Sequence, residues 1–255
     1  MNGYWAFVKK EFLEYARTYK LLILGLVFLL FGLMNPLTAK FTPDLLGVLA
    51  PEGLQITLPE PTALDAWAQF FKNVSQIGLI VLVVLFSGML ATEFAKGTLV
   101  QMLTKGLSRS AVLLAKWTGA AVLWTGAYGL CFAVTGLYTL YFWREGVATG
   151  PLLHAVLALW LFGLLLLSAL LLGGVLWKTH AGGLLFVGGF VVLLFVLNVF
   201  PVLRGGNPIA LAADNLTLVQ GEAEAGALGL PACVAVGLSA AFVAVACVVF
   251  RRKQL

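Results

Sequence analysis

The sequence predicts an all-α, polytopic membrane protein with six transmembrane helices, an N-terminal amphipathic interfacial helix and both termini in the cytoplasm. Of its 255 residues, 61% are hydrophobic and 11% are charged, whereas about a quarter of residues are charged in an ordinary soluble domain. The mean hydropathy is +1.01. Six apolar stretches are each long enough to cross a bilayer, and the basic residues gather on one side of them. Together these stretches form a single transmembrane domain over residues 1–255.

A spanning helix needs about 20 predominantly apolar residues, because its backbone polar groups must be satisfied within the segment. Asp, Glu, Lys and Arg are absent from the six stretches except at their ends. No small-residue cleavage site follows the first stretch, so we expect it to be retained as a span. The predicted spans are Leu21–Leu37, Val74–Ala91, Trp117–Trp143, Leu152–Trp177, Ala181–Leu203 and Leu228–Phe250.

The distribution of charge predicts the orientation. With six spans the two termini share a side, and the cytoplasmic side carries the excess of Lys and Arg. If that side holds the termini, it carries twelve of the sixteen basic residues, while eight of the eleven acidic residues lie outside. The net charge of +5 therefore indicates orientation and attraction to membrane lipids rather than nucleic-acid binding.

Residues 1–20 have the pattern of an amphipathic helix. We expect it to lie in the inner interface and to run straight into the first span. It is either a simple anchor or an elbow helix that also contacts a partner or the neighbouring spans. Its predicted apolar face consists of Trp5, Val8, Phe12, Tyr15 and Tyr19.

The first outer loop, residues 38–73, contains a signal for a short helix. Thr62 and Asp65 have the spacing of a capping box with a shorter acid. Trp67, Phe70 and Phe71 would share one face of the helix that follows. Such a helix either rests on the outer leaflet or forms a lid over the outer mouth of a pathway.

The inner loop, residues 92–116, is charged and patterned. Leu99, Met102 and Leu103 form an apolar helical stripe. Gly106 can end that helix and Ser108 can cap the next one. The loop is either a surface that a soluble motor domain grips or an ordinary connection.

Several classes of site are disfavoured by the sequence. Cys131, Cys233 and Cys247 lie in predicted spans without Cys-x-x-Cys spacing, and His154 and His180 are isolated, so we expect neither a disulfide nor a metal site. The absence of Gly-x-Ser-x-Gly, His-Glu-x-x-His and paired Asp argues against an intramembrane enzyme. One polar feature within a span is a candidate pathway or hinge: Asn198 and Pro201. We expect the asparagine to bond the carbonyl that the proline leaves free.

Read together, several stretches resemble the ABC-2-type transporter permease family, in particular its small six-span bacterial members. They are Tyr4–Phe12, Gln69–Gly78, Glu93–Thr98 and Leu103–Arg109, followed by Lys116. Many relatives have Pro before the Ser-Arg pair, where this chain has Gly106-Leu107.

The resemblance implies a permease in the bacterial cytoplasmic membrane that pairs with a second permease copy or a related permease. A dimer of cytoplasmic ABC ATPase subunits would bind ATP and Mg and drive export of a lipophilic or amphiphilic substrate. The chain has no Gly-x-x-x-x-Gly-Lys-Ser/Thr loop of its own, so we expect it to bind no cofactor and catalyse no reaction. The alternative is a scaffold or sensor that recruits an ATPase without transport.

By the same resemblance, the ATPase-coupling surface lies on the inner loop. Glu93 would be bonded by backbone amides or by a nearby base such as Arg109, or lie at a solvated helix end. Gly97 and Gly106 would permit tight turns. The implied coupling residues are Glu93, Lys96, Gly97, Thr98, Lys105, Gly106, Ser108 and Arg109.

Overall fold

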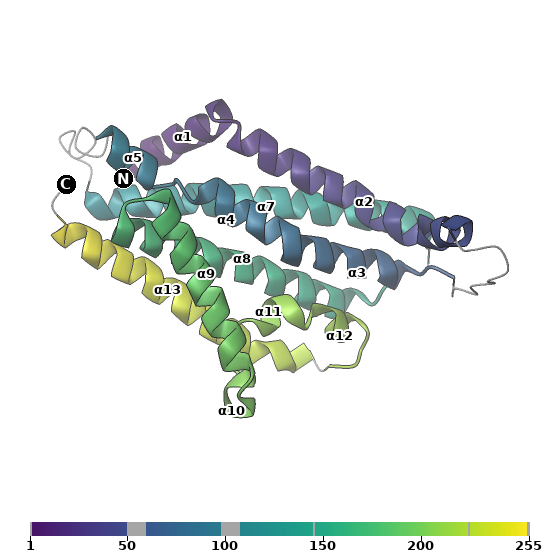
Figure 1. Cartoon of the computed structure of the whole chain (residues 1–255). Helices are drawn as coiled ribbons and strands as arrows, with labels where there is room; N and C mark the ends of the chain where they lie inside the picture. Colours follow the sequence, from purple (N-terminus) through teal and green to yellow (C-terminus); the bar gives the residue numbers. More distant parts are fainter. Residues whose placement is uncertain (1, 50–59, 98–107, 145, 224, 254–255) are drawn as a thin grey trace.

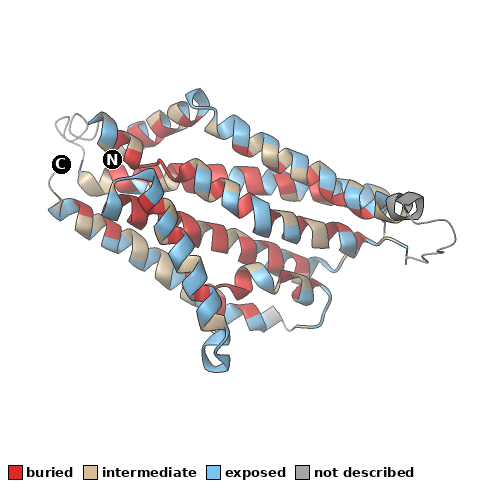
Figure 2. Ribbon diagram, viewed as in Figure 1, coloured by how far each residue is buried: buried red, intermediate tan, exposed pale blue. Residues whose placement is uncertain are grey.

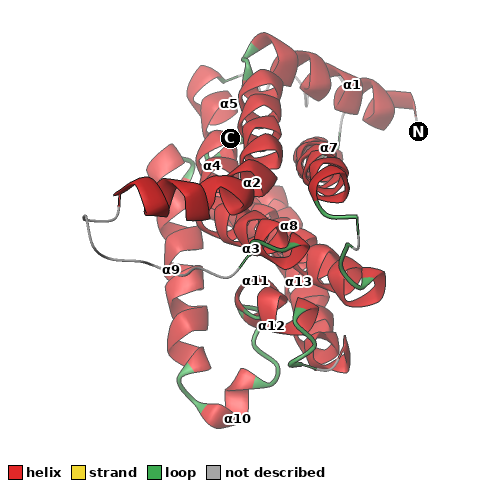
Figure 3. Cartoon of the chain, turned by 90° about the vertical axis from the view of Figure 1, so that its right-hand side faces the viewer, coloured by secondary structure: helices red, strands yellow, loops and turns green. Residues whose placement is uncertain are grey.

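A computed structural model describes the chain except for residues 1, 50–59, 98–107, 145, 224 and 254–255. The described residues form helices and connecting turns, with no strand among them (Figure 3). Six helical segments are long and apolar enough to cross a membrane. The predicted all-α class and the six predicted spans are therefore confirmed.

The helices run side by side in an elongated bundle, with both chain termini at one end (Figure 1). We call this end the termini end and the other the far end. In chain order the helices are α1 (Asn2–Arg17), α2 (Lys20–Leu49), α3 (Ala63–Asn73), the π-helix η1 (Val74–Gly78), α4 (Leu79–Phe86), α5 (Ala91–Lys96), α7 (Arg109–Phe142), α8 (Thr149–Trp177), α9 (His180–Asn198), α10 (Pro201–Arg204), α11 (Ala210–Ala213), α12 (Asn215–Val219), the 3₁₀ helix η2 (Ala225–Leu228) and α13 (Gly229–Arg252).

α8 is the central helix of the bundle and is mostly buried (Figure 2). α7, α9 and α13 pack around it. Gly163 of α8 faces the indole of Trp124 so closely that an added Cβ would lie 2.5 Å from the ring. The missing side chain thus lets α7 and α8 approach at this level.

α1 is a separate helix, and it does not run straight into α2 as predicted. The chain breaks at Tyr19, whose φ is 58°. The predicted apolar face is also partly wrong, because Trp5 and Tyr19 are exposed. The buried face consists of Phe7, Val8, Glu11 and Tyr15, so α1 packs on the bundle with a carboxylate inside its contact surface.

The first predicted outer loop is mostly helical. α2 continues through Pro36 and Pro43 to Leu49, past the predicted end at Leu37. The second span also begins earlier than predicted, because α3, η1 and α4 follow one another without a gap from Ala63 to Phe86. They lie within the span-length segment Ala63–Ala95. Residues 38–49 and 63–73 of the predicted loop are therefore helical, and its middle part, 50–59, lies outside the described residues.

The capping box that opens α3 is confirmed. The Thr62 N–H donates to Asp65 Oδ2 over 2.8 Å. Trp67, Phe70 and Phe71 are buried rather than lying on the outer leaflet. The rings of Trp67 and Phe70 pack on α7. Because large rings gain most from full burial, the amphipathic start of α3 packs inward. A lid role for these three residues stays a prediction.

The fifth span ends at Asn198, five residues before its predicted end at Leu203. Pro201 starts the short helix α10, where it needs no intrahelical partner. The predicted bond from Asn198 to a carbonyl left free by proline is therefore wrong. Instead Asn207 donates to the Leu194 carbonyl over 2.7 Å. A pathway or hinge role for Asn198 and Pro201 stays a prediction.

Candidate functional site

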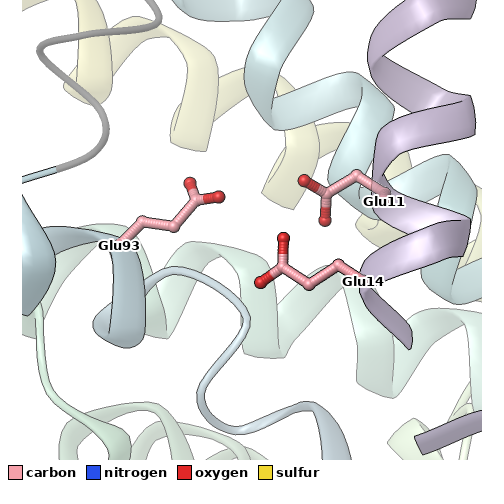
Figure 4. Close-up of side chains that lie close together, drawn as sticks. All are labelled: Glu11, Glu14 and Glu93. Atoms are coloured by element: carbon pink, nitrogen blue, oxygen red, sulfur yellow. The ribbon is translucent and has the colours of Figure 1, made fainter. Parts of the chain in front are cut away.

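Five charged side chains from three helices meet at the termini end, and we call them the ion cluster: Lys10, Glu11 and Glu14 of α1, Glu93 of α5 and Lys116 of α7. The three carboxylates point toward one another (Figure 4). Glu11, Glu93 and Lys116 are buried. The cluster therefore joins segments that lie up to 105 residues apart in the chain.

Lys116 is the centre of the ion cluster. Its Nζ lies 3.0 Å from Glu11 Oε2 and 2.8 Å from Glu93 Oε1. Lys10 Nζ lies 3.2 Å from the same Glu93 oxygen and 2.8 Å from Glu14 Oε2. The two ammonium groups thus bridge three carboxylates, which leaves one excess negative charge.

Local structure explains why these side chains converge. Lys10 and Glu14 are four residues apart on one helix, the spacing at which side chains meet. Glu93 lies in the first turn of α5, directly after a break in the second span at Ser87–Leu90. Gly88 lies in this break against His180, where an added Cβ would lie 2.1 Å from the ring. The break turns the chain so that Glu93 faces α1 and α7.

α1 has further contacts with α7 outside the ion cluster. The Tyr4 hydroxyl and Thr118 Oγ1 are 2.8 Å apart. The Tyr15 ring packs on Gly119, where an added Cβ would lie 3.1 Å from it. The elbow-helix alternative, in which α1 contacts the spans, is therefore confirmed over the simple anchor.

The electrostatics of α1 follow from the ion cluster. Desolvation acts to lower the pKa of Lys10, but the hydrogen bond to Glu14 and the charges of Glu11 and Glu93 outweigh it and raise that pKa. Desolvation acts to raise the pKa of Glu14, and its hydrogen bond to Lys10 outweighs this, so that pKa is lowered. Both side chains are thus charged at neutral pH.

The predicted coupling residues fall into separate groups. Glu93 belongs to the ion cluster. Gly97 ends α5 with φ of 64°, which confirms the tight turn predicted there. Ser108 caps α7 by accepting the Ala111 N–H over 3.2 Å, which confirms the predicted cap. Thr98, Lys105, Gly106 and the predicted stripe around Met102 lie outside the described residues, as does the side chain of Lys96.

Arg109 does not pair with Glu93 as one prediction had it. Its Nη1 donates to the carbonyls of Phe250, Arg251 and Lys253, the last over 2.6 Å. These carbonyls lie at the end of α13, where backbone acceptors lack intrahelical partners. Arg109 therefore ties the start of α7 to the end of α13. The base beside Glu93, predicted to be Arg109, is instead Lys116.

Sequence reasoning missed Glu11 and Lys116. One signal was available: Glu11 occupies the same helical stripe as Val8 and Tyr15, at spacings of three and four. A carboxylate in an apolar stripe indicates a buried partner of opposite charge. Lys116, directly before the apolar run at Trp117, was the corresponding base.

The ion cluster also has the composition of a carboxylate metal site, since oxygens of Glu11, Glu14 and Glu93 lie within 4.8 Å of one another. However, these carboxylates already accept from Lys10 and Lys116. A cation would have to displace the ammonium groups, so the donor set fits lysine better than metal.

A cavity of about 660 Å³ lies farther along the same span. It is lined by residues of α3, η1 and α4 on one side and of α8, α9, α11 and α12 on the others. Most of these side chains are aliphatic or aromatic, including Phe71, Phe162 and Val187. The volume and the lining are typical of a site for a lipophilic small molecule.

No family model matches the chain. It is similar to the uncharacterized transmembrane protein YxlG of Bacillus subtilis (strain 168), with 23% identity over 133 residues. That match covers 50% of this chain and 52% of YxlG, so the chain spans about half the length of this relative. The similarity and the six apolar segments agree on a multi-pass membrane protein.

Proposed function

We propose that the chain is the permease subunit of an ABC transporter that exports a lipophilic or amphiphilic substrate. It acts in the bacterial cytoplasmic membrane with both termini inside. A separate pair of cytoplasmic ATPase subunits binds ATP and Mg and drives it. A second permease copy, identical or related, completes the pathway. The resemblance of Glu93–Thr98 and Leu103–Arg109 to ABC-2-type permeases supports this assignment.

A single observation carries the proposal: one span both lines the cavity and enters the ion cluster. Between Ala68 and Val84 this span forms one wall of the cavity. After the break at Ser87–Leu90 it supplies Glu93 to the ion cluster. A displacement of α5 is therefore transmitted to the wall of the cavity along a continuous chain segment.

The ion cluster sets which helices move together. Force on the inner loop acts on α5 at Gly97 and on α7 at Ser108. Lys116 binds α5 and α1 to α7, and Arg109 binds α7 to α13. ATP-driven closure of the motor dimer would thus move these four helices as one body. α9, which lines the cavity opposite α4, would shift against that body.

The test is a pull-down of the chain in mild detergent, followed by an ATPase assay with the recovered partner. We expect an ATP-hydrolysing subunit whose activity is stimulated by a lipophilic compound. Glu93→Gln and Arg109→Ala should each reduce that stimulation at least about fivefold, which corresponds to about 1 kcal/mol of coupling free energy. Lys9→Gln is the matched control, because Lys9 is exposed on α1.

Three outcomes separate the alternatives. Loss of stimulation in both loop variants, with the ATPase still bound, supports the permease. An ATPase that binds but never responds to a lipophilic compound supports the scaffold instead. Recovery of the chain without any nucleotide-hydrolysing partner contradicts both.

A further inference from the structure

A groove of about 560 Å³ lies where α7, α8 and α13 meet, and it shares no lining residue with the cavity described above. α7 contributes Leu114 and Trp117 to its lining, and α8 contributes Leu161 and Leu164. The rest of the lining comes from α13. The proposed transport pathway does not include this part of the molecule, which we call the α13 groove.

Small side chains on one face of α13 leave the space of the groove. The α13 residues that line it recur at spacings of three and four, which places them along one side of the helix. Four of the six are Ser, Ala or Cys, so the space that larger side chains would fill stays open. From first to last they cover about 16 Å of helix, at about 1.5 Å per residue. They are Val236, Ser239, Ala240, Val243, Ala244 and Cys247.

An arginine lies at the termini end of the groove. Arg251 follows Cys247 by one helical turn on α13, and Ser110 precedes Leu114 by one turn on α7. Arg251 Nε donates to Ser110 Oγ over 2.9 Å and so joins α13 to α7. The Nη1 and Nη2 groups of Arg251 have no hydrogen-bond partner among the described residues. The bond to Ser110 therefore holds a guanidinium with free donors at the end of the groove.

The surroundings of Arg251 are basic. Neither α7 nor α13 contains an acidic residue. The carboxylates that reach α7 in the ion cluster are already paired with Lys10 and Lys116. A group of bases at a membrane surface attracts anionic lipids. The bases at the start of α7 and the end of α13 are Arg109, Arg251, Arg252 and Lys253.

The length of the groove matches one leaflet of a bilayer. The hydrocarbon core of a bilayer is about 30 Å thick, so each leaflet contributes about 15 Å. The groove covers about 16 Å and begins one turn inside Arg251, at the termini end, where α13 ends (Figure 1). In the proposed orientation this end lies at the inner leaflet. A phospholipid of that leaflet whose acyl chain follows the groove therefore has its phosphate at the level of Arg251.

A second copy of this chain fits the groove less well than a lipid. Two copies with the same orientation in one membrane are related by an axis along the membrane normal. An interface at the groove would therefore bring the basic ends of both copies to the same level. The two hollow faces would also meet each other and leave space unfilled, unlike the close packing of protein interiors. An acyl chain instead fills the hollow, and its headgroup supplies the opposite charge.

We propose that the α13 groove binds one acyl chain of an anionic phospholipid of the inner leaflet, whose phosphate is held by Arg251. A guanidinium binds phosphate oxygens through two parallel N–H groups, and Arg251 has donors free for this. The lipid bridges α7 and α13 at the end where Arg109 also joins them. This inference goes beyond the proposed function and holds for any role of the chain in the membrane.

The test uses palmitoyl-oleoyl phosphatidylglycerol and palmitoyl-oleoyl phosphatidylcholine, which share both acyl chains and the phosphate but differ in net charge. Each lipid is titrated into the delipidated full chain in detergent, and bound lipid is counted by native mass spectrometry. We expect one site that binds phosphatidylglycerol at least about fivefold more tightly, because bases near a headgroup favour a net negative charge.

Variants locate the phosphate and the acyl chain. Arg251→Gln should weaken binding of phosphatidylglycerol about tenfold, the loss expected for charge-assisted hydrogen bonds. Arg252→Gln is the matched control, because it removes the same charge from the next residue, which lies outside the lining stripe. Ala240→Trp fills the groove and should weaken binding of both lipids at least about tenfold. Ala241→Trp should leave binding unchanged, because Ala241 is equally exposed but does not line the groove.

Equal affinity of the wild type for the two lipids would overturn the inference, and that comparison needs no variant to fold. Equal effects of Arg251→Gln and Arg252→Gln would also overturn it, as would unchanged lipid binding by Ala240→Trp. A lipid-free dimer in the wild type and Ala241→Trp that becomes a monomer in Ala240→Trp would assign the groove to a second copy instead.

Discussion

Two clusters of polar side chains fasten α7 to helices that precede it in the chain. One cluster is charged and the other is neutral. At the termini end, the ion cluster joins α1, α5 and α7 through Lys116. Farther along the bundle, Asn35 of α2 donates to Thr135 Oγ1 of α7 over 3.1 Å and accepts from Asn73 of α3 over 2.8 Å. We call these three residues the amide node.

The difference in charge corresponds to the different surroundings of the two clusters. The neutral amide node satisfies its members without burying charge, which suits the interior of a membrane. The ion cluster buries charge near the inner loop, where losing one partner strands another. The amide node therefore fastens its helices without buried charge, whereas the ion cluster makes any separation of Glu93 on α5 from α1 and α7 costly, so these helices move together.

Of the changes to the two clusters, removal of Lys116 should destabilise the protein most. Lys116→Met leaves the two buried carboxylates of Glu11 and Glu93 to share the half-exposed Lys10 alone, which should lower the free energy of unfolding by about 3–5 kcal/mol. The measurement is SDS-induced unfolding in mixed micelles, followed by tryptophan fluorescence. Lys9→Met, on the exposed face of α1, serves as the control.

The double variant Glu11→Gln with Lys116→Met sharpens this test. It removes both buried charges of the pair and leaves Glu93 bonded to Lys10. A smaller loss in the double variant than in Lys116→Met alone is expected, because the cost comes from the stranded carboxylate. Equal losses would mean that Lys116 acts through packing alone.

The sequence predicted the spans well, because the length and hydropathy of an apolar run are local properties. It failed where partners come from distant segments. Glu11 belongs to the buried stripe of α1 only because Lys116 lies opposite it, 105 residues later. The aromatic residues Trp5 and Tyr19 indicated an interface instead, since both are common at membrane surfaces.

The end of the first span was mispredicted for a related reason. Proline lacks the N–H of an intrahelical bond, and Pro36 and Pro43 stand on either side of the predicted end at Leu37. The helix continues through both, and Asn35, beside the first proline, is buried in the amide node. Tertiary packing at that position outweighs the local preference, and no pattern near Asn35 indicates Thr135 or Asn73 as its partners.

Disruption of the amide node should have a smaller effect than loss of Lys116. Asn35→Val removes the bonds to both Thr135 and Asn73, and interhelical hydrogen bonds in membranes contribute about 0.6 kcal/mol on average and up to about 2. We expect a loss of about 1–2 kcal/mol in the same unfolding assay.

Thr42→Val is the control for the amide node, because its hydroxyl bonds only the Thr38 carbonyl of its own helix. A loss after Asn35→Val as large as that after Lys116→Met would contradict the distinction drawn between the charged and the neutral fastening.

Acid should weaken the ion cluster and leave the amide node unchanged. Its effect on stability should be smaller than that of Lys116→Met or Asn35→Val. The pKa of Glu14 is lowered from its ordinary value of 4.5 by the bond to Lys10, so its stabilisation is complete above that value. It is lost as pH falls through the folded-state pKa. The pKa of Lys10 is raised above 10.5, so its contribution persists across neutral pH and is lost only in strong alkali.

The measurement compares the unfolding temperature of wild type and Glu14→Gln in nanodiscs between pH 3 and pH 7. The wild type should be the more stable at pH 7, and the difference should shrink below about pH 4.5. Asn35→Val should instead differ from wild type by the same amount at every pH, because none of its partners titrates. A Glu14→Gln difference that stays constant down to pH 3 would mean that ionisation of Glu14 adds nothing to the stability of the cluster, whose charged contacts between helices are then those of Lys116 with Glu11 and Glu93 and of Lys10 with Glu93.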